Sequence, residues 1–231
     1  MLEPLVLLPG MMCDGRLFDA QIAAFSHERA VMVAPLTGAD TMSALASAVL
    51  ANAPSRFALA GLSMGGIVAM EIIRQAPDLV SRLALLDTNA LADPPEMAAT
   101  REAQVDRVLN GGLRSVMRDE LKPNYLTVGP HREMILSLCM VMAEKLGPKV
   151  FADQSAAIQH RPDQCDTLKS VGVPTVLLCG EDDRLFPVSR HEFMCGLIPG
   201  SKLAVIPGAG HLPTLEQSEH TNRRLKEWLR M

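Results

Sequence analysis

The chain has 231 residues, of which 48% are hydrophobic and 21% charged, and its formal net charge is −4. This length and apolar content suffice for one domain with a substantial buried core. The mild acidity excludes the strongly basic surface typical of nucleic-acid-binding proteins, and no apolar run reaches the roughly 18 residues of a transmembrane helix. We therefore expect no nucleic acid and no membrane as a partner.

The first apolar run and the cysteines bear on the compartment and on cofactors. Residues 5–8 are too few for the hydrophobic region of a signal peptide and lack a basic flank, which predicts a strand of the mature fold and a cytoplasmic protein. The five cysteines are odd in number and show no C-x-x-C spacing, a pattern that argues against a disulfide framework, a zinc site or a redox motif. We expect no cofactor and no metal.

Strand-like and helix-like patterns alternate through most of the chain. Short apolar runs predict strands at residues 5–8, 30–34, 57–60, 83–86, 175–179 and 203–206. Helical patterns fall near residues 18–25, 42–51, 64–74, 189–195 and 215–228. This alternation predicts an α/β fold with a mostly parallel sheet of about six strands and helices on both faces.

The alternation stops between residues 91 and 165, where apolar residues recur at helical spacing. We interpret this segment, 91–165, as a helical cap inserted into a core formed by residues 1–90 and 166–231. Its many methionines favour an adaptable apolar pocket for small aliphatic groups.

A candidate nucleophile lies between the third strand and the helix that follows it. Gly61, Ser63 and Gly65 form a G-x-S-x-G pentapeptide at this strand-to-helix turn. The glycines allow strand and helix to approach closely, and the sharp turn directs the serine hydroxyl outward. A structural turn rich in glycine would be the simpler interpretation if the pentapeptide stood alone.

Further residues supply the partners that a serine nucleophile needs. His211 follows the last expected strand and a glycine-rich turn, a position suited to a general base. Asp182 and Asp183 follow the strand before it, where one of them can orient the histidine. The chain order of serine, acid and histidine differs from that of chymotrypsin and subtilisin.

Together these segments resemble the α/β-hydrolase superfamily, and in particular small bacterial esterases, lactonases and carbon–carbon bond hydrolases. The resemblance spans nearly the whole chain through residues 7–11, 61–65, 180–187 and 208–212. It implies a triad of Ser63, Asp183 and His211, because the family pattern G-x-x-D-x-x-x-P selects Asp183. Asp182 is the second choice, and Asp87 is a third because some members carry the acid after the strand that follows the nucleophile.

The same resemblance implies an oxyanion hole made of the backbone N–H groups of Met64 and Met11. Many relatives have His-Gly in the loop after the first strand, whereas this chain has Pro9 and Gly10. The substitution removes a bracing imidazole but keeps the glycine and the main-chain donor. We expect the oxyanion hole to be retained.

The predicted function is hydrolysis of a small carboxylic ester or lactone through an acyl-enzyme. The partner is then a small-molecule acyl substrate, and a homo-oligomer is compatible with the sequence. The alternatives are carbon–carbon bond hydrolysis or elimination on the same fold, and a ligand-binding protein that has kept the fold without catalysis. Arg161 is interpreted as a bridge between cap and core, with contact to a substrate carboxylate as its alternative role. The remaining histidines are expected at the surface: His27, His131, His160, His191 and His220.

Overall fold

The computed structural model describes residues 2–231, and its centre is one parallel sheet of six strands. Their order across the sheet is β2-β1-β3-β4-β5-β6, and every neighbouring pair is parallel. The strands are β1 (Leu5–Leu8), β2 (Val31–Val33), β3 (Phe57–Leu62), β4 (Val80–Leu86), β5 (Thr175–Gly180) and β6 (Lys202–Ile206). The predicted fold class is confirmed.

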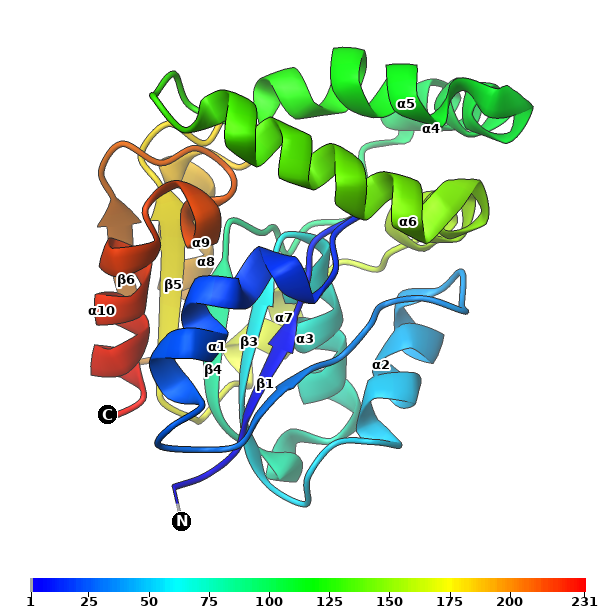
Figure 1. Cartoon of the computed structure of the whole chain (residues 1–231). Coiled ribbons are helices and arrows are strands. Elements are labelled where there is room, and N and C mark those ends of the chain that lie inside the picture. Colours follow the sequence, from blue (N-terminus) through cyan, green and yellow to red (C-terminus); the bar gives the residue numbers. More distant parts are fainter. Residues whose placement is uncertain (1) are drawn as a thin grey trace.

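The helices cover both faces of this sheet (Figure 1). They are α1 (Asp19–Phe25), α2 (Met42–Leu50), α3 (Met64–Gln75), α4 (Ala98–Arg107), α5 (Leu113–Ser115), α6 (Arg132–Gln159), α7 (Cys165–Lys169), α8 (Val188–Leu197), α9 (Pro213–Glu216) and α10 (Ser218–Trp228). Helices α1 and α10 pack together on one face, and α2, α3, α7 and α8 pack in sequence on the other. Within residues 2–231, no helix combines the length and the apolar character needed to cross a bilayer.

The strand sequences divide the core into two apolar layers. Successive side chains of a strand point to opposite faces of the sheet. In β1, Val6 and Leu8 accordingly belong to one buried cluster, and Leu5 and Leu7 belong to the other. All four side chains are fully buried, because β1 lies between β2 and β3 and helices cover both faces.

The strand order also fixes where a site can form. The chain passes from β1 outward to β2 and returns to β3 on the other side of β1. Connections leaving the carboxyl ends of β1 and β3 therefore diverge, which opens a crevice at the edge where ligands bind in α/β folds. Ser63 follows β3 directly at this edge.

Segment 91–165 forms α4, α5 and α6 and lies across the carboxyl ends of the strands, coloured green in Figure 1. Helix α6 is broken at Gly147, whose φ of 83° is not helical, and Pro148 follows immediately. A proline removes one helical hydrogen bond and clashes with the preceding turn, so the two arms of α6 take different directions.

Most element boundaries differ from the sequence expectation by one or two residues, and two differences are larger. Strand β4 begins at Val80, three residues before the apolar run that predicted it. The last predicted helix is divided into α9 and α10 at Gln217, whose φ of −138° and ψ of 54° interrupt the helical backbone.

Candidate active site

The turn that carries Ser63 is sharp and closely packed. Ser63 has a φ of 56° and a ψ of −117°, an unfavourable backbone conformation for a residue other than glycine. A Cβ atom on Gly61 would collide with the carbonyl of Gly65, and one on Gly65 would collide with the carbonyl of Leu8. Only glycine therefore allows β3, α3 and β1 to approach this closely, and the close approach leaves the serine at the apex of the turn.

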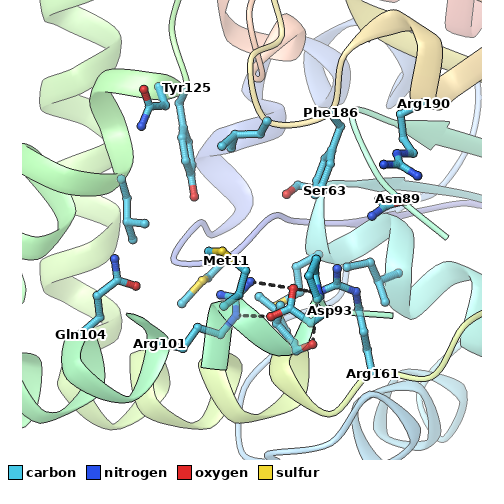
Figure 2. A pocket seen from close by; sticks show the side chains of 18 of the residues that line it. Met11, Ser63, Asn89, Asp93, Arg101, Gln104, Tyr125, Arg161, Phe186 and Arg190 are labelled. Carbon is cyan, nitrogen blue, oxygen red and sulfur yellow. Dashed lines mark hydrogen bonds and ion pairs between the residues drawn. The ribbon is translucent and has the colours of Figure 1, made fainter. Parts of the chain in front are cut away.

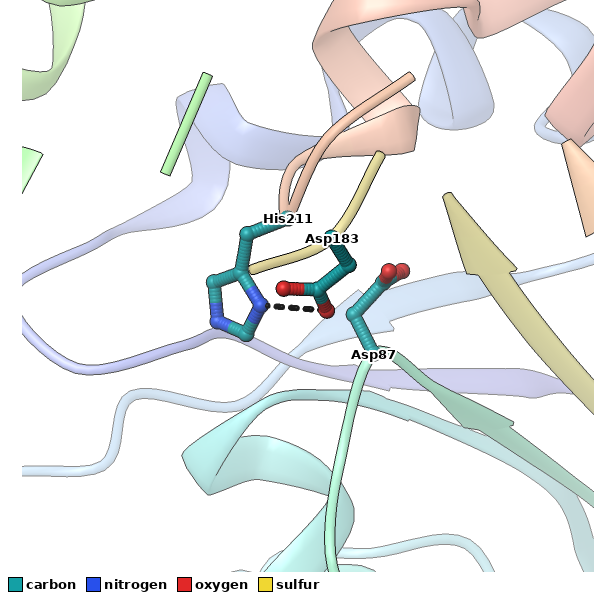
Figure 3. A group of neighbouring side chains, drawn as sticks. All are labelled: Asp87, Asp183 and His211. Carbon is teal, nitrogen blue, oxygen red and sulfur yellow. Dashed lines mark hydrogen bonds and ion pairs between the residues drawn. The ribbon is translucent and has the colours of Figure 1, made fainter. Parts of the chain in front are cut away.

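Ser63, His211 and Asp183 are joined by two hydrogen bonds. The Oγ of Ser63 lies 2.9 Å from Nε2 of His211. On the other side of the ring, Nδ1 of His211 lies 2.9 Å from Oδ2 of Asp183, a contact drawn in Figure 3. Both partners of the serine are buried, with 1% and 4% of their surfaces exposed. Since one ring nitrogen faces a carboxylate and the other a hydroxyl, the imidazole is oriented to take the serine proton.

The surroundings of Asp183 keep its carboxyl group ionised. Its Oδ1 accepts hydrogen bonds from the backbone N–H groups of Leu185 at 2.8 Å and Phe186 at 3.1 Å. Burial by itself would raise the pKa of Asp183, but the attraction of His211 and these hydrogen bonds outweigh it and hold the pKa below its ordinary value. Asp182 is exposed and instead accepts a hydrogen bond from the hydroxyl of Thr127.

Asp87, the third candidate acid, lies beyond Asp183 as seen from His211 (Figure 3). The hydrogen bond of Nδ1 of His211 goes to Asp183, so Asp87 is not the acid of the triad. Its Oδ1 accepts the N–H of Gly180 at 2.8 Å, and its Oδ2 is buried without a partner. Burial and the neighbouring charge of Asp183 raise the pKa of Asp87 well above its ordinary value. Burial therefore favours the protonated form of Asp87 beside the carboxylate of Asp183.

These three side chains also have donor atoms suited to a metal ion. One ligand atom each of Asp87, Asp183 and His211 lies within 4.8 Å of the others. Both ring nitrogens of His211 already have hydrogen-bonding partners, however, which leaves no free imidazole nitrogen for a metal. The group is better explained as a chain of proton donors and acceptors behind Ser63.

Two backbone N–H groups beside Ser63 are free to bind an anion. No hydrogen bond between described residues uses the N–H of Met64 or of Met11. Met64 is the first residue of α3, where the aligned peptide dipoles favour negative charge, and Met11 lies in the turn after β1. Both residues line the same cavity as Ser63 (Figure 2).

The turn after β1 is braced by a residue that the sequence did not single out. Gln154, in the second arm of α6, accepts the N–H of Met12 at 2.9 Å and donates to the carbonyl of Leu36 at 2.8 Å. Met12 has a φ of 56°, so this bond holds a conformation that the residue rarely adopts. Gln154 thereby stabilises the loop that contains Pro9 and Gly10.

The loop of His211 is held by two further residues from outside the expected motifs. The carbonyl of Tyr125 accepts the N–H of His211 at 2.7 Å, and its ring stacks edge-on against the imidazole at 5.0 Å. The carboxyl group of Glu216 accepts the N–H groups of Thr127, Gly210 and Leu212. Sequence distance conceals the contacts of Tyr125 and Thr127, which belong to segment 91–165, whereas Gly210 and Leu212 are close to Glu216 in sequence.

The cavity beside Ser63 has a volume of about 360 Å³ and a largely apolar lining near the serine. Met11, Met64 and Ile67 line it from the core, and Met97 and Ile158 from segment 91–165. This volume suits a small acyl compound.

Arg161 joins the two ends of segment 91–165, and none of its hydrogen bonds to described residues reaches the core as the sequence interpretation expected. Its guanidinium group donates to Asp93 at 2.7 Å and to the carbonyl groups of Leu91 and Ile158. Only 3% of the side chain is exposed, so its donors are directed into the protein. Asp93 also binds Arg101, and the three side chains form one ion-pair cluster at the cavity wall (Figure 2).

The expectation of a surface position is wrong for His191. This side chain is fully buried on α8, where Nε2 accepts the N–H of Thr88 at 3.1 Å. Burial lowers the pKa of His191 to about 4, so the ring is neutral. Thr88 in turn donates to the carbonyl of Ser63 at 2.7 Å, which connects His191 to the serine turn.

Comparison with known proteins gives consistent results. The chain is 30% identical to an esterase from Thermogutta terrifontis with malate bound, with 99% of this chain and 89% of that one covered and a TM-score of 0.90. A pimeloyl-[acyl-carrier protein] methyl ester esterase from Aliivibrio salmonicida is 25% identical over 97% of this chain and 91% of its own length. The enol-lactonase of Burkholderia xenovorans shares the fold, with 20% identity, coverage of 100% and 92%, and a TM-score of 0.89.

These likenesses extend over the core and segment 91–165 alike. The sequence pattern of the alpha/beta hydrolase family matches residues 5–221, which is most of the chain. With its parallel sheet, its strained serine turn and this match, the chain belongs to the alpha/beta hydrolase family.

Proposed function

We propose that this protein hydrolyses a small carboxylic ester or lactone by nucleophilic catalysis at Ser63. The observation that carries the proposal is the pair of 2.9 Å contacts that joins Ser63 to His211 and His211 to Asp183 beside the cavity. A serine, an imidazole and an ionised carboxylate in this arrangement form the constellation that performs acyl transfer on several unrelated folds.

In the proposed reaction, Nε2 of His211 removes the proton of Ser63 as Oγ attacks the acyl carbonyl. The imidazolium ion then gives this proton to the leaving alkoxide as the carbon–oxygen bond breaks, which leaves an acyl-enzyme and an alcohol. Water, activated by the same imidazole, attacks the acyl-enzyme and releases the acid. Asp183 holds the imidazole in the productive tautomer and stabilises its positive charge. The steps use only side chains, backbone and water, so no cofactor enters them.

The oxyanion of each tetrahedral intermediate is assigned to the N–H groups of Met11 and Met64. Neither donor has an acceptor among residues 2–231, and both border the cavity at the serine. Fixed backbone donors need no reorganisation during the reaction, and loss of one such donor typically lowers turnover by about 10² to 10³.

The substrate class follows from the cavity and from the comparisons. A cavity of about 360 Å³ admits a compact acyl group. The similar proteins include an esterase, a methyl ester esterase and an enol-lactonase, which supports an ester or lactone substrate here. We assign segment 91–165 the role of a substrate-shaping cap, because Met97 and Ile158 from it line the cavity above the serine.

The test is hydrolysis of para-nitrophenyl esters from acetate to decanoate by wild type and by Ser63→Ala. We expect a chain-length optimum and a loss of turnover of at least about 10³ in the variant. A fluorophosphonate probe should label wild type and not Ser63→Ala. A folded protein whose esterase activity survives this substitution contradicts the assignment.

A further inference from the structure

The cavity beside Ser63 has an end that is not apolar. Arg190, on α8, and Asn89, which follows β4, line it together (Figure 2). In that view they lie on the opposite side of the cavity from Gln104. The two residues therefore bring a guanidinium group and a carboxamide into the space where a substrate must bind.

The guanidinium group of Arg190 has no acceptor among residues 2–231. No ion pair or side-chain hydrogen bond within this range involves it, although its backbone N–H bonds to the carbonyl of Pro187. The side chain is only partly exposed. A guanidinium group offers five donors in a planar fork that matches a carboxylate, so a partner for it is expected from the ligand.

Asn89 supplies a second donor at the same place. Only 7% of the residue is exposed, and its Oδ1 accepts the N–H of Leu91 at 3.2 Å. This bond directs the other half of the carboxamide, Nδ2, away from the backbone, and no acceptor for Nδ2 lies among the described residues. Nδ2 is accessible from the cavity and is free to donate to a ligand there.

The charges around the cavity favour an anion as that ligand. Two acidic side chains line it, Asp93 and Glu120. Asp93 is shared by two arginines, Arg101 and Arg161, and Glu120 is paired with Arg107. Without Arg190 the lining is neutral, because Asp93 and Glu120 balance Arg101 and Arg161, so Arg190 gives the cavity its net positive charge.

We propose that Arg190 and Asn89 bind a carboxylate on the acyl part of the substrate, which makes the substrate a half-ester or lactone of a dicarboxylic acid. This inference rests on the proposed esterase function and specifies its substrate class. The acyl part stays bound to Ser63 after the alcohol has left, so a group that holds it acts in both acylation and deacylation. A neutral acyl chain would leave both donors unsatisfied.

The test compares two substrates that differ in one functional group. Monomethyl glutarate carries a free carboxylate, and its analogue carries a carboxamide in the same position. We expect wild type to favour the carboxylate by about tenfold or more in kcat/KM, as a charge-assisted bidentate contact implies. Arg190→Gln should remove this preference and leave hydrolysis of the carboxamide within about threefold. Asn89→Asp, which keeps the acceptor for Leu91 but adds a negative charge, should reverse it.

The control is Arg56→Gln, which removes the same charge from an exposed position at the start of β3, away from the cavity. It should keep the wild-type preference, because only a local contact is expected to matter. Equal rates for the two esters in wild type, or a preference that survives Arg190→Gln, would overturn the proposal.

A binding measurement separates this proposal from the proposed function. In Ser63→Ala protein, glutarate should raise the melting temperature, and in Ser63→Ala with Arg190→Gln it should not. If esters are hydrolysed but glutarate gives no shift, the carboxylate site is wrong and the esterase function stands. If no ester is hydrolysed but the shift depends on Arg190, the site stands and the reaction class is wrong.

Discussion

Gln154 binds the backbone N–H of Met12 across 142 positions of sequence, and through it the second arm of α6 holds the loop that carries Met11. Both polar ends of the carboxamide are used, since Nε2 donates to the carbonyl of Leu36. The geometry of the proposed oxyanion hole therefore depends on a side chain from segment 91–165.

Gln154→Leu should lower kcat by about tenfold or more with little change in KM, because a displaced Met11 donor weakens the transition state more than the bound substrate. The free energy of unfolding should fall by about 1–3 kcal/mol, since the Met12 N–H and the Leu36 carbonyl lose their partner. Steady-state kinetics and chemical denaturation measure the two effects. Gln159→Leu, at the partly exposed end of the same helix, is the matched control. Equal kinetics for the two variants would show that Gln154 does not position the loop of Met11.

Asp183→Asn should lower kcat by up to about 10⁴, because an amide in place of the carboxylate favours the wrong tautomer of His211. Asp182→Asn should stay within about threefold of wild type, since its carboxylate only accepts from Thr127 at the surface. Parallel measurement of kcat/KM decides between the neighbours. A larger loss of kcat/KM for Asp182→Asn than for Asp183→Asn would mean that Asp182 is the acid of the triad.

Asp87→Asn should be tolerated, because an amide keeps an acceptor for the Gly180 N–H and offers a neutral donor to Asp183, as the protonated acid does. Asp87→Ala should lower the free energy of unfolding by about 1–3 kcal/mol through the unpaired N–H of Gly180. It should also lower kcat as the carboxylate of Asp183 loses its neighbour. An Asp87→Asn variant as inactive as Asp183→Asn would mean that Asp87 works as an ionised group.

Glu71 gives the stability of this protein a defined dependence on pH. Burial opposes ionisation of Glu71, but hydrogen bonds from Arg74, Gln75 and Gln164 prevail and lower its pKa to about 2. Because this folded-state pKa lies below the ordinary 4.5, the stabilisation is complete above pH 4.5 and is lost as the pH falls toward 2.

Denaturant titrations between pH 6 and pH 3 should thus show a steeper fall in the free energy of unfolding for wild type than for Glu71→Gln. The difference should match the proton linkage of one carboxyl group whose pKa is lowered on folding. Asp166→Asn, which alters an exposed carboxylate, provides the comparison. Parallel slopes for wild type and Glu71→Gln would refute the contribution of Glu71.

The sequence was sufficient wherever a local pattern determines the structure. Alternating strands and helices predicted the parallel sheet, and short motifs predicted that Ser63, Asp183 and His211 would meet. Each of these residues follows the carboxyl end of a strand, and parallel strands bring those ends to one edge.

Contacts between segments that are distant in sequence could not be predicted from local patterns. Gln154 and Tyr125 are ordinary residues in ordinary helical or loop patterns, and their roles arise only when segment 91–165 is folded over the core. Of the backbone contacts of Glu216, the one with Thr127 has the same origin. His191 shows the same limit, because burial on α8 depends on packing against Thr88 and not on its own neighbours in sequence.

The break in α6 at Gly147 separates an arm that lines the cavity from an arm that does not. The second arm carries Gln154 and Ile158, so replacements there reach the reaction centre directly. Among the described residues, none from 132 to 146 lines the cavity, and Met134 and Val141 are open to solvent. Homologous chains should accumulate substitutions faster before the break than after it. An alignment of these chains should therefore show a drop in substitution rate at the position of Gly147.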